Sequence, residues 1–299
     1  MCSNFDVVSL MHVRHMVRWL VAAVGCVCAI SLPAQNSAPA SASGGGALPT
    51  AKEIMDHVVE RARWVEQNRP ALQYTYVQHT MIEKFDDDGG VKEREERLYR
   101  LERIEGEPFM RLVQKNGQPP TSKDLEDEKK REREFRKRLA ERRARSKPDE
   151  ESFRFDSDLI SKYRAEVLGR EVVNGRAAYV LRFEPKSDDL PVRKRIDRLT
   201  NKLAGKLWID EKDHEIVKAE GRLVAPARVG WGLLANFQKL DFAFEQVRMD
   251  DATWLPLRLD ARLEGRVVFS TLNQRQTIRW KDFQKTAASA PQKASATRH

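Results

Sequence analysis

The stretch LPLRLDARLEGRVVF, residues 255–269, carries the pattern that decides the fold. Its odd positions from Leu255 to Phe269 are all apolar or small, and its even positions from Arg258 to Arg266 are all charged. A chain with this period of two can hide one face from water only as a strand in a sheet that has one wet side. The pattern predicts an antiparallel sheet whose apolar face is covered by helices, by a second layer or by a ligand.

Further strands are expected on both sides of this stretch. The clearest hairpin signal is Asn174-Gly175, because both residues tolerate the positive φ angles of a tight two-residue turn. β-rich or alternating runs bounded by turn residues predict strands at 72–85, 91–104, 109–115, 163–173, 176–185, 205–210, 215–224, 237–249, 254–263 and 267–283.

One amphipathic helix is expected before the first strand. Thr50 and Glu53 have the spacing of a capping box, in which each side chain bonds the backbone amide of the other residue. Apolar residues then recur at helical spacing, and Pro70 marks the end of the helix. Ile54, Met55 and Val58 on its apolar side need a partner, and the sheet is the nearest one.

A highly charged segment, 122–146, interrupts the sheet region and is expected to be a helical insertion. Acidic residues crowd its first turns, whereas 129–145 holds ten basic and three acidic residues, which complements the helix dipole. Only Leu125, Phe135 and Leu139 are able to dock, so an exposed or mobile arm is expected.

Three interpretations of this arm are open. It is a solvated helix held soluble by its ion pairs, or it contacts anionic lipid headgroups through cations such as Arg142, Arg143 and Arg145. A basic stripe also suits nucleic-acid phosphates, but the chain carries no recognised nucleic-acid motif and has the features of an exported protein. A nucleic-acid partner is therefore not expected.

The first fifty residues indicate export. Arg14 and Arg18 precede an uncharged stretch at 19–34 that is too short for a comfortable membrane span of about 20 residues. We expect a signal peptide at 1–34, a disordered linker at 35–48, one domain at 49–284 and a disordered tail at 285–299. The expected location is the periplasm, and the alternative is a lipoprotein anchored at Cys26.

Composition excludes several kinds of site. All three cysteines, Cys2, Cys26 and Cys28, lie in the segment that cleavage removes, which excludes thiolate nucleophiles and cysteine-bound metals from the mature chain. The formal net charge of +9 makes an acidic surface or partner plausible.

The sequence offers little evidence for an enzyme. His57 stands three residues before Glu60, and His214 lies in an expected polar turn, but neither position has a third metal ligand in view. The sequence shows no glycine-rich phosphate loop, no nucleophile elbow and no convincing acid–base pair. A noncatalytic protein without cofactor or metal is therefore expected.

Residues 163–210 carry a resemblance to a known family. Val167-Leu168-Gly169-Arg170-Glu171, followed by Asn174-Gly175-Arg176 and by the run at 205–210, resembles the outer-membrane lipoprotein-sorting proteins. That superfamily includes the LolA and LolB carriers and the RseB sensor. The resemblance implies an α+β fold, a curved antiparallel half-barrel wrapped around helices, from which the charged insertion is a departure.

The resemblance also implies a periplasmic cavity that accepts acyl chains. The strand positions expected to line it are Tyr179, Leu181, Phe183, Trp208, Leu257 and Leu259. Burial of each methylene group stabilises a bound chain by about 0.8 kcal/mol, so a dry apolar trough suffices for binding. The expected function is binding of a lipid or lipidated polypeptide.

The alternative is a structural or regulatory envelope protein without a ligand. The same Leu and Phe faces can be filled completely by the leading helix, through Ile54, Met55 and Val58. The void beneath the sheet decides between these two functions.

Overall fold

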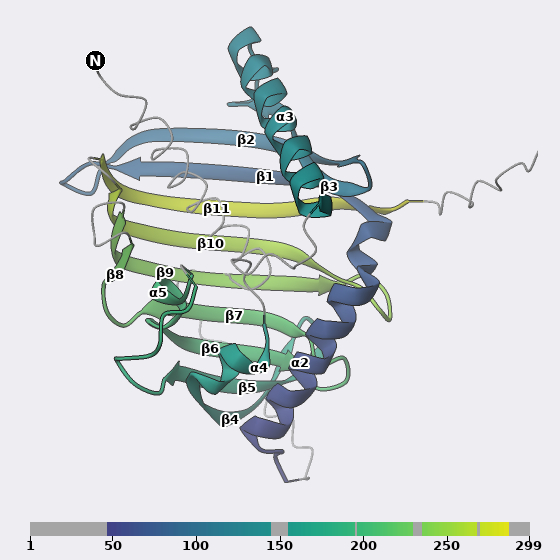
Figure 1. The fold of residues 1–299 in the computed structure, drawn as a ribbon, viewed down its shortest axis with the longest axis vertical. Helices are drawn as coiled ribbons and strands as arrows, with labels where there is room; N and C mark the ends of the chain where they lie inside the picture. The colour runs from purple at the N-terminus through teal and green to yellow at the C-terminus, as the bar shows by residue number, and fades with distance from the viewer. Residues whose placement is uncertain (1–46, 145–154, 195, 230–234, 268–269, 287–299) are drawn as a thin grey trace, which may run out of the picture.

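The expected α+β fold with one open antiparallel sheet is confirmed by a computed structural model (Figure 1). The structure describes residues 47–144, 155–194, 196–229, 235–267 and 270–286. The predicted signal peptide and most of the linker and tail lie outside these residues, as does Arg145. Cys26, the alternative lipid anchor, also lies outside them.

The described residues form an eleven-stranded sheet in the order β3-β2-β1-β11-β10-β9-β7-β6-β5-β4, with β8 paired to β9. Its strands are β1 (Tyr74–Phe85), β2 (Val91–Ile104), β3 (Glu107–Lys115), β4 (Tyr163–Val173), β5 (Arg176–Pro185), β6 (Leu203–Asp210), β7 (Ile216–Leu223), β8 (Ala227–Val229), β9 (Ala235–Arg248), β10 (Trp254–Val267) and β11 (Ser270–Lys285). The first strand thus pairs with the last one, and this seam joins the two halves of the sheet.

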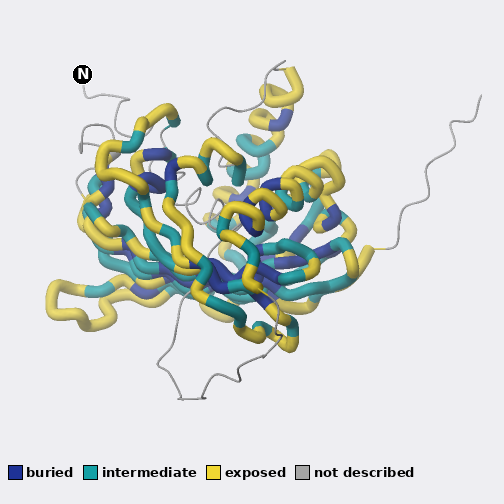
Figure 2. Tube along the Cα trace, turned by 90° about the horizontal axis from the view of Figure 1, so that it is seen from below, coloured by how far each residue is buried: buried dark blue, intermediate teal, exposed yellow. Residues whose placement is uncertain are grey.

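The helices lie on one face of the sheet (Figure 1). They are α2 (Ala51–Asn68), the short 3-10 helix η1 (Pro70–Gln73), α3 (Ser122–Ala144), α4 (Ser157–Ser161) and α5 (Asp197–Thr200). Figure 2 shows that the sheet curves toward this side, so the helices lie in its concavity. None of the helices in the described part of the chain has the length and apolar character needed to cross a membrane.

Helix α2 begins and ends where the sequence predicts. The Thr50 hydroxyl accepts a bond from the Glu53 amide at 3.2 Å, and the Glu53 carboxylate accepts one from the Thr50 amide at 2.7 Å. This confirms the capping box. At the other end Arg69 adopts a left-handed conformation, with φ of 48°, and Pro70 starts the 3-10 helix.

The predicted hairpin turns also form. Asn174 and Gly175 have φ angles of 51° and 77°, as a two-residue turn with two positive φ angles requires. Glu105 and Gly106 make the same kind of turn between β2 and β3.

The start of the predicted tail differs from the expectation. The predicted tail begins at Lys285, but Lys285 ends β11, and the Thr286 amide donates to the Gln73 carbonyl at 2.7 Å. The strand therefore extends further because η1 supplies an acceptor that the local sequence does not reveal. Pro256, in the central strand β10, lies next to a register shift between Pro256 and Arg258, consistent with its missing amide donor.

Candidate functional site

The concave face of the sheet is lined by one continuous cross-strand row. Residues that face one another in successive strand pairs share a face of the sheet, so the register defines the row. It runs through Leu181, Leu207, Ala219, Phe244, Leu259, Ile278 and Thr80. The face is thus apolar from β5 to β11 and becomes polar at β1.

Three of the predicted cavity residues meet under α2. Tyr179, Leu181 and Phe183 alternate along β5 and pack in one cluster with Ile54, Met55 and Val58 of the helix. Leu181 is 0% exposed there. The part of the concavity beneath α2 is therefore filled by the chain's own side chains.

The other part of the concave face is built mainly from strands β8 to β11. Its cluster has a core of large side chains, among them Phe237, Phe244 and Leu259, each at most 1% exposed. In the described part of the chain, the helical side chain that packs against this cluster is Leu199 of α5, with Ile196 at the helix start. Leu259 is thus on the predicted face. We call this cluster the β8–β11 face.

The prediction that Trp208 shares this cavity is wrong. Trp208 pairs with Val180, and both belong to the cluster on the opposite, convex face. Its indole nitrogen donates to a Glu171 carboxylate oxygen at 2.7 Å, and the Lys218 ammonium lies 4.2 Å from its ring centre. Leu207, one residue earlier, is the concave one, because neighbours along a strand point to opposite faces.

The predicted alternation also fails at Leu257. The register shifts between Pro256 and Arg258, so Leu257 has no cross-strand partner in the β9–β10 pair, and its side chain is half-buried. From Arg258 onward the period of two holds, which explains why Leu259, Ala261 and Leu263 are buried together.

Two glycines lie on the concave face next to the cluster under α2. Gly205 and Gly221 are cross-strand partners, and Gly221 also faces Phe242. A Cβ atom on Gly221 would lie 2.4 Å from the Phe242 ring, so the ring occupies the space above the glycine. Sequence reasoning missed this contact, although Gly221 inside a predicted strand was a signal of close approach.

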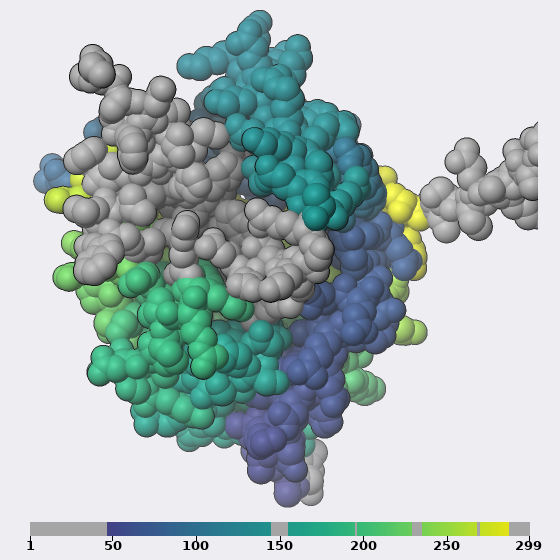
Figure 3. All heavy atoms as spheres, viewed as in Figure 1, coloured from purple at the N-terminus to yellow at the C-terminus, as the bar shows by residue number. Residues whose placement is uncertain are grey.

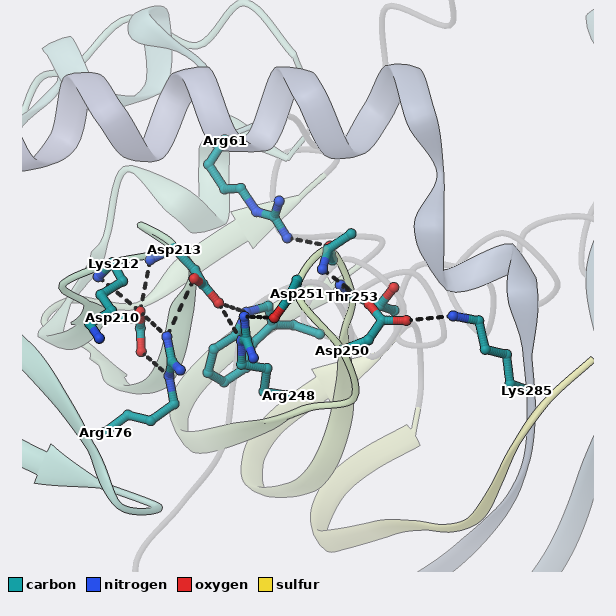
Figure 4. Close-up of polar contacts among 12 residues, drawn as sticks. Arg61, Arg176, Asp210, Lys212, Asp213, Arg248, Asp250, Asp251, Thr253 and Lys285 are labelled. Carbon is teal, nitrogen blue, oxygen red and sulfur yellow. Dashed lines mark hydrogen bonds and ion pairs between the residues drawn. The ribbon is translucent and has the colours of Figure 1, made fainter.

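A polar network closes one end of the half-barrel (Figure 4). Arg176 of β5 contacts Asp210 at 2.5 Å and Asp213 at 3.3 Å, and Arg248 of β9 contacts the other oxygen of Asp213 at 2.7 Å. Burial by itself raises the pKa of the Asp210 carboxyl, but hydrogen bonds from Arg176 and backbone amides hold that pKa below its ordinary value. The Asp210 carboxylate is thus ionised, and the network ties the turns together.

The same end of the sheet is joined to its first and last strands. Asp250, in the β9–β10 turn, accepts hydrogen bonds from Lys285 of β11 at 2.9 Å and from the Tyr74 hydroxyl of β1 at 2.8 Å. These bonds hold the pKa of Asp250 well below its ordinary value. Since the partners come from within the chain, these polar groups are structural.

The two histidines considered for an enzyme come together. The rings of His57, in α2, and His214, in the β6–β7 turn, have centroids 4.5 Å apart. In the described residues, no group of three or more His, Cys, Asp or Glu side chains is placed to hold a metal ion. The pair is instead a contact between the helix and the turn.

The expectation of an exposed or mobile arm is wrong for the inner side of α3. Leu139 is 2% exposed, and the rings of Phe135 and Phe109 have centroids 5.2 Å apart. Glu132 also pairs with Arg111 of β3 at 2.8 Å. Leu125, the third of the residues able to dock, is 49% exposed. The helix is held against the edge hairpin β2–β3.

Helix α3 also satisfies backbone groups of the edge strand. Glu128 accepts a bond from the Leu112 amide at 3.3 Å, and Arg131 donates to the Met110 carbonyl. An exposed strand edge offers such groups to other chains, so these bonds block that edge.

Two of the three cations proposed for membrane contact are bound to this hairpin. Arg143 donates to Glu105 at 2.5 Å, and Arg142 lies 3.8 Å from Glu107. Figure 3 shows α3 and α2 on the same side of the molecule.

The sequence matches no protein-family model and no curated protein. Among solved structures, it is similar to a domain from Vibrio parahaemolyticus described as an outer membrane lipoprotein-sorting protein domain, with 14% identity and a TM-score of 0.33 over 79% of this chain and 95% of that chain. It is also similar to a LolA superfamily protein from Nitrosomonas europaea, with 12% identity and a TM-score of 0.28 over 80% and 94%. MucB is similar at 15% identity and a TM-score of 0.26, over 81% of this chain and 60% of that chain. The first two bear names of the superfamily that the sequence resembles, and the likeness concerns the course of the chain alone.

Proposed function

We propose that this chain is a noncatalytic periplasmic protein that binds a lipid, or the acyl chain of a lipidated polypeptide, on the β8–β11 face. The observation that carries the proposal is the composition of that face. It presents aromatic and aliphatic side chains in an unbroken row across β9, β10 and β11, including Phe244, Leu259 and Ile278.

Binding at this face is favoured over binding beneath α2. Phe244 and Leu259 are as buried as Leu181, each 0% exposed. The described helical residues that pack against the β8–β11 face belong to the short helix α5, namely Leu199 with Ile196 at the helix start, whereas three side chains of the longer helix α2 cover Leu181 and its neighbours. An acyl chain would separate α5 from the strands and lie along them. Each methylene group that it buries contributes about 0.8 kcal/mol, so a long chain compensates for the lost side-chain contacts.

A filled core without a ligand is the second candidate, and the packing under α2 favours it. Leu181 is 0% exposed and Ile54 and Met55 are 2% and 6% exposed, and this close packing supports a filled core. In this function the sheet is a rigid support, and the protein acts in the envelope as a structural or regulatory interaction partner.

Lipid extraction and photolabelling separate the two candidates. The exported protein is purified without detergent and extracted with organic solvent, and the extract is analysed by mass spectrometry. The protein is then titrated with a palmitic acid that carries a photoreactive diazirine, and labelled peptides are sequenced. The proposal expects co-purified acyl compounds and saturable labelling within 235–267 and 270–280.

A matched pair of variants locates the site. Phe242→Ala changes the concave face, and Val180→Ala changes a similarly buried residue, 5% against 3% exposed, on the convex face. Labelling is expected to fall in the first variant and to persist in the second, with both variants checked for folding by circular dichroism. An empty extract together with unsaturable labelling would establish the filled core instead.

A further inference from the structure

Helix α3 presents two sides with different contacts. Its inner side is bound to the edge hairpin through Glu128, Arg131, Glu132, Phe135, Arg136 and Arg143. Those cations all have carboxylate partners at 3.3 Å or less. The inner side therefore explains why the helix docks, but it leaves the charges of the outer side unexplained.

Four exposed cations lie together on the outer side. Lys129, Arg133 and Lys137 are spaced four residues apart, and Lys130 stands three residues before Arg133, so the four share one flank of the helix. We call them the basic flank.

The cations of the basic flank make almost no ion-pair contacts within the described residues. Lys129, Lys130 and Arg133 make no hydrogen bond or ion pair with any residue that the structure describes. Lys137 lies 4.0 Å from Glu141, and both side chains are at least half exposed, so solvent screens that pair. Like charges at this spacing destabilise a helix slightly. The cluster is thus not there to stabilise α3.

We infer that the basic flank binds an anionic membrane surface through the phosphates of lipid headgroups. Exposed lysine and arginine side chains on a helix gain free energy near such a surface, and this attraction needs no pocket. The choice of lipid over other polyanions rests on the periplasmic location proposed above. Helix α3 lies on the concave side of the sheet (Figure 1). Contact through the basic flank would therefore turn the concave, ligand-binding side of the protein toward the bilayer.

The inference assigns different roles to neighbouring cations. Arg142 and Arg143 hold the helix to Glu107 and Glu105 and are not the membrane contacts. Charge reversal at these two positions would detach the helix and change membrane binding indirectly. The informative substitutions are those in the basic flank, because they leave the docking contacts of α3 intact.

The test is cosedimentation of the full exported protein with vesicles. The vesicles contain either phosphatidylcholine alone or a mixture with about 30% phosphatidylglycerol, whose anionic headgroups give the surface a negative potential. The protein is expected to bind the anionic vesicles and to lose affinity as salt is raised. The variant Lys129→Glu, Lys130→Glu, Arg133→Glu, Lys137→Glu is expected to bind at least about tenfold more weakly.

A second variant controls for net charge. Lys92→Glu, Lys206→Glu, Arg222→Glu and Lys281→Glu changes four exposed cations on the strands by the same total charge. It is expected to keep wild-type binding within about twofold, because screening confines the attraction to nearby charges. An equal loss in both variants would overturn the inference, and so would unchanged binding in the basic-flank variant.

Two further readouts keep the inference separate from the proposed function. Photolabelling by the acyl probe is expected to be the same in the basic-flank variant and the wild type, so a failure of lipid binding in the wild type refutes the proposed function alone. Binding of soluble polyphosphate without binding of anionic vesicles would overturn the membrane assignment.

Discussion

The imidazole of His57 in α2 stacks against that of His214 in the β6–β7 turn, with ring centroids 4.5 Å apart and planes tilted by 39°. Burial lowers the pKa of His214, and the neighbouring His57 lowers it further, while Asp210, Asp213 and Glu60 oppose the shift. The contact therefore joins the helix to the sheet best when the His214 ring is neutral.

This pair predicts a loss of stability in mild acid. The unfolded chain takes up a proton at His214 near pH 6.5, whereas the folded chain does so only at lower pH. The free energy of unfolding therefore has its full value above pH 6.5. It falls as the pH is lowered through the pKa that His214 has in the folded chain. Urea unfolding at pH 7.5 and pH 5.5 measures the loss. The variant His214→Asn, which tolerates the φ of 51° at this position, is expected to lose less. Equal losses in both proteins would exclude the pair as the cause.

The second prediction concerns Arg61, which donates to Glu215 at 2.8 Å and to the Ala252 carbonyl at 2.7 Å. Arg61→Met leaves the Glu215 carboxylate buried without its cation, so we expect a loss of about 2–4 kcal/mol at pH 7. Burial raises the pKa of Glu215 even beside Arg61. As the pH falls through that raised pKa, the carboxyl becomes neutral, and the loss should shrink.

The control for Arg61 is an exposed pair on the same helix. Lys52 contacts Asp56 at 2.6 Å, but the two side chains are 83% and 59% exposed. Lys52→Met should therefore leave the free energy of unfolding almost unchanged, because solvent screens the pair. A loss in Arg61→Met no larger than that in Lys52→Met would show that the Glu215 pair contributes little.

The third prediction concerns the close approach of Phe242 to Gly221. A methyl group at Gly221 would meet the ring at 2.4 Å, so Gly221→Ala should lower the free energy of unfolding by about 1–3 kcal/mol. Adding Phe242→Leu should restore part of this loss, because the smaller side chain leaves room. Thermal or urea unfolding of the single and double variants measures the coupling. Strictly additive losses would mean that the ring is not the obstacle.

The fourth prediction tests the docking of α3. Leu139→Ala removes a side chain that is 2% exposed and should loosen the helix from β2–β3. Leu125→Ala, at a side chain that is 49% exposed on the same helix, is the control. Limited trypsin digestion should cut within 123–143 several times faster in the first variant and at the wild-type rate in the second. Identical digestion of both would contradict the docked position.

The strands of this fold could be predicted from the sequence better than their faces. The alternation in 255–269 predicted the strand correctly, but the register shift between Pro256 and Arg258 breaks the alternation at Leu257. Trp208 was assigned to the cavity by resemblance, without knowledge of its strand register. Leu181 pairs with Leu207 on the concave face, so the next residue, Trp208, points to the convex face. Register depends on turn geometry and bulges, which a short pattern does not determine.

The docking of α3 could not be predicted for a different reason. Counting apolar residues gave three weak anchors, whereas the helix is held largely by charges such as Glu132, whose partner Arg111 lies on an edge strand. The sequence showed that both charges exist but not that they meet. The β8–β11 face was likewise only partly predicted, because Phe237 and Phe244 lie on a strand whose neighbours were unknown.

The pairing of β1 with β11 has a consequence for how the chain reaches its native state. Tyr74 and Lys285 are partners across this seam, although nearly the whole domain separates them in sequence. Contacts of such long range form slowly, because a large loop has to close before they are made. The β1 edge of the β1–β2 hairpin therefore stays unpaired until the last strand, β11, has been synthesised and has reached it. A chain cut short before Ser270 would keep that edge open to aggregation.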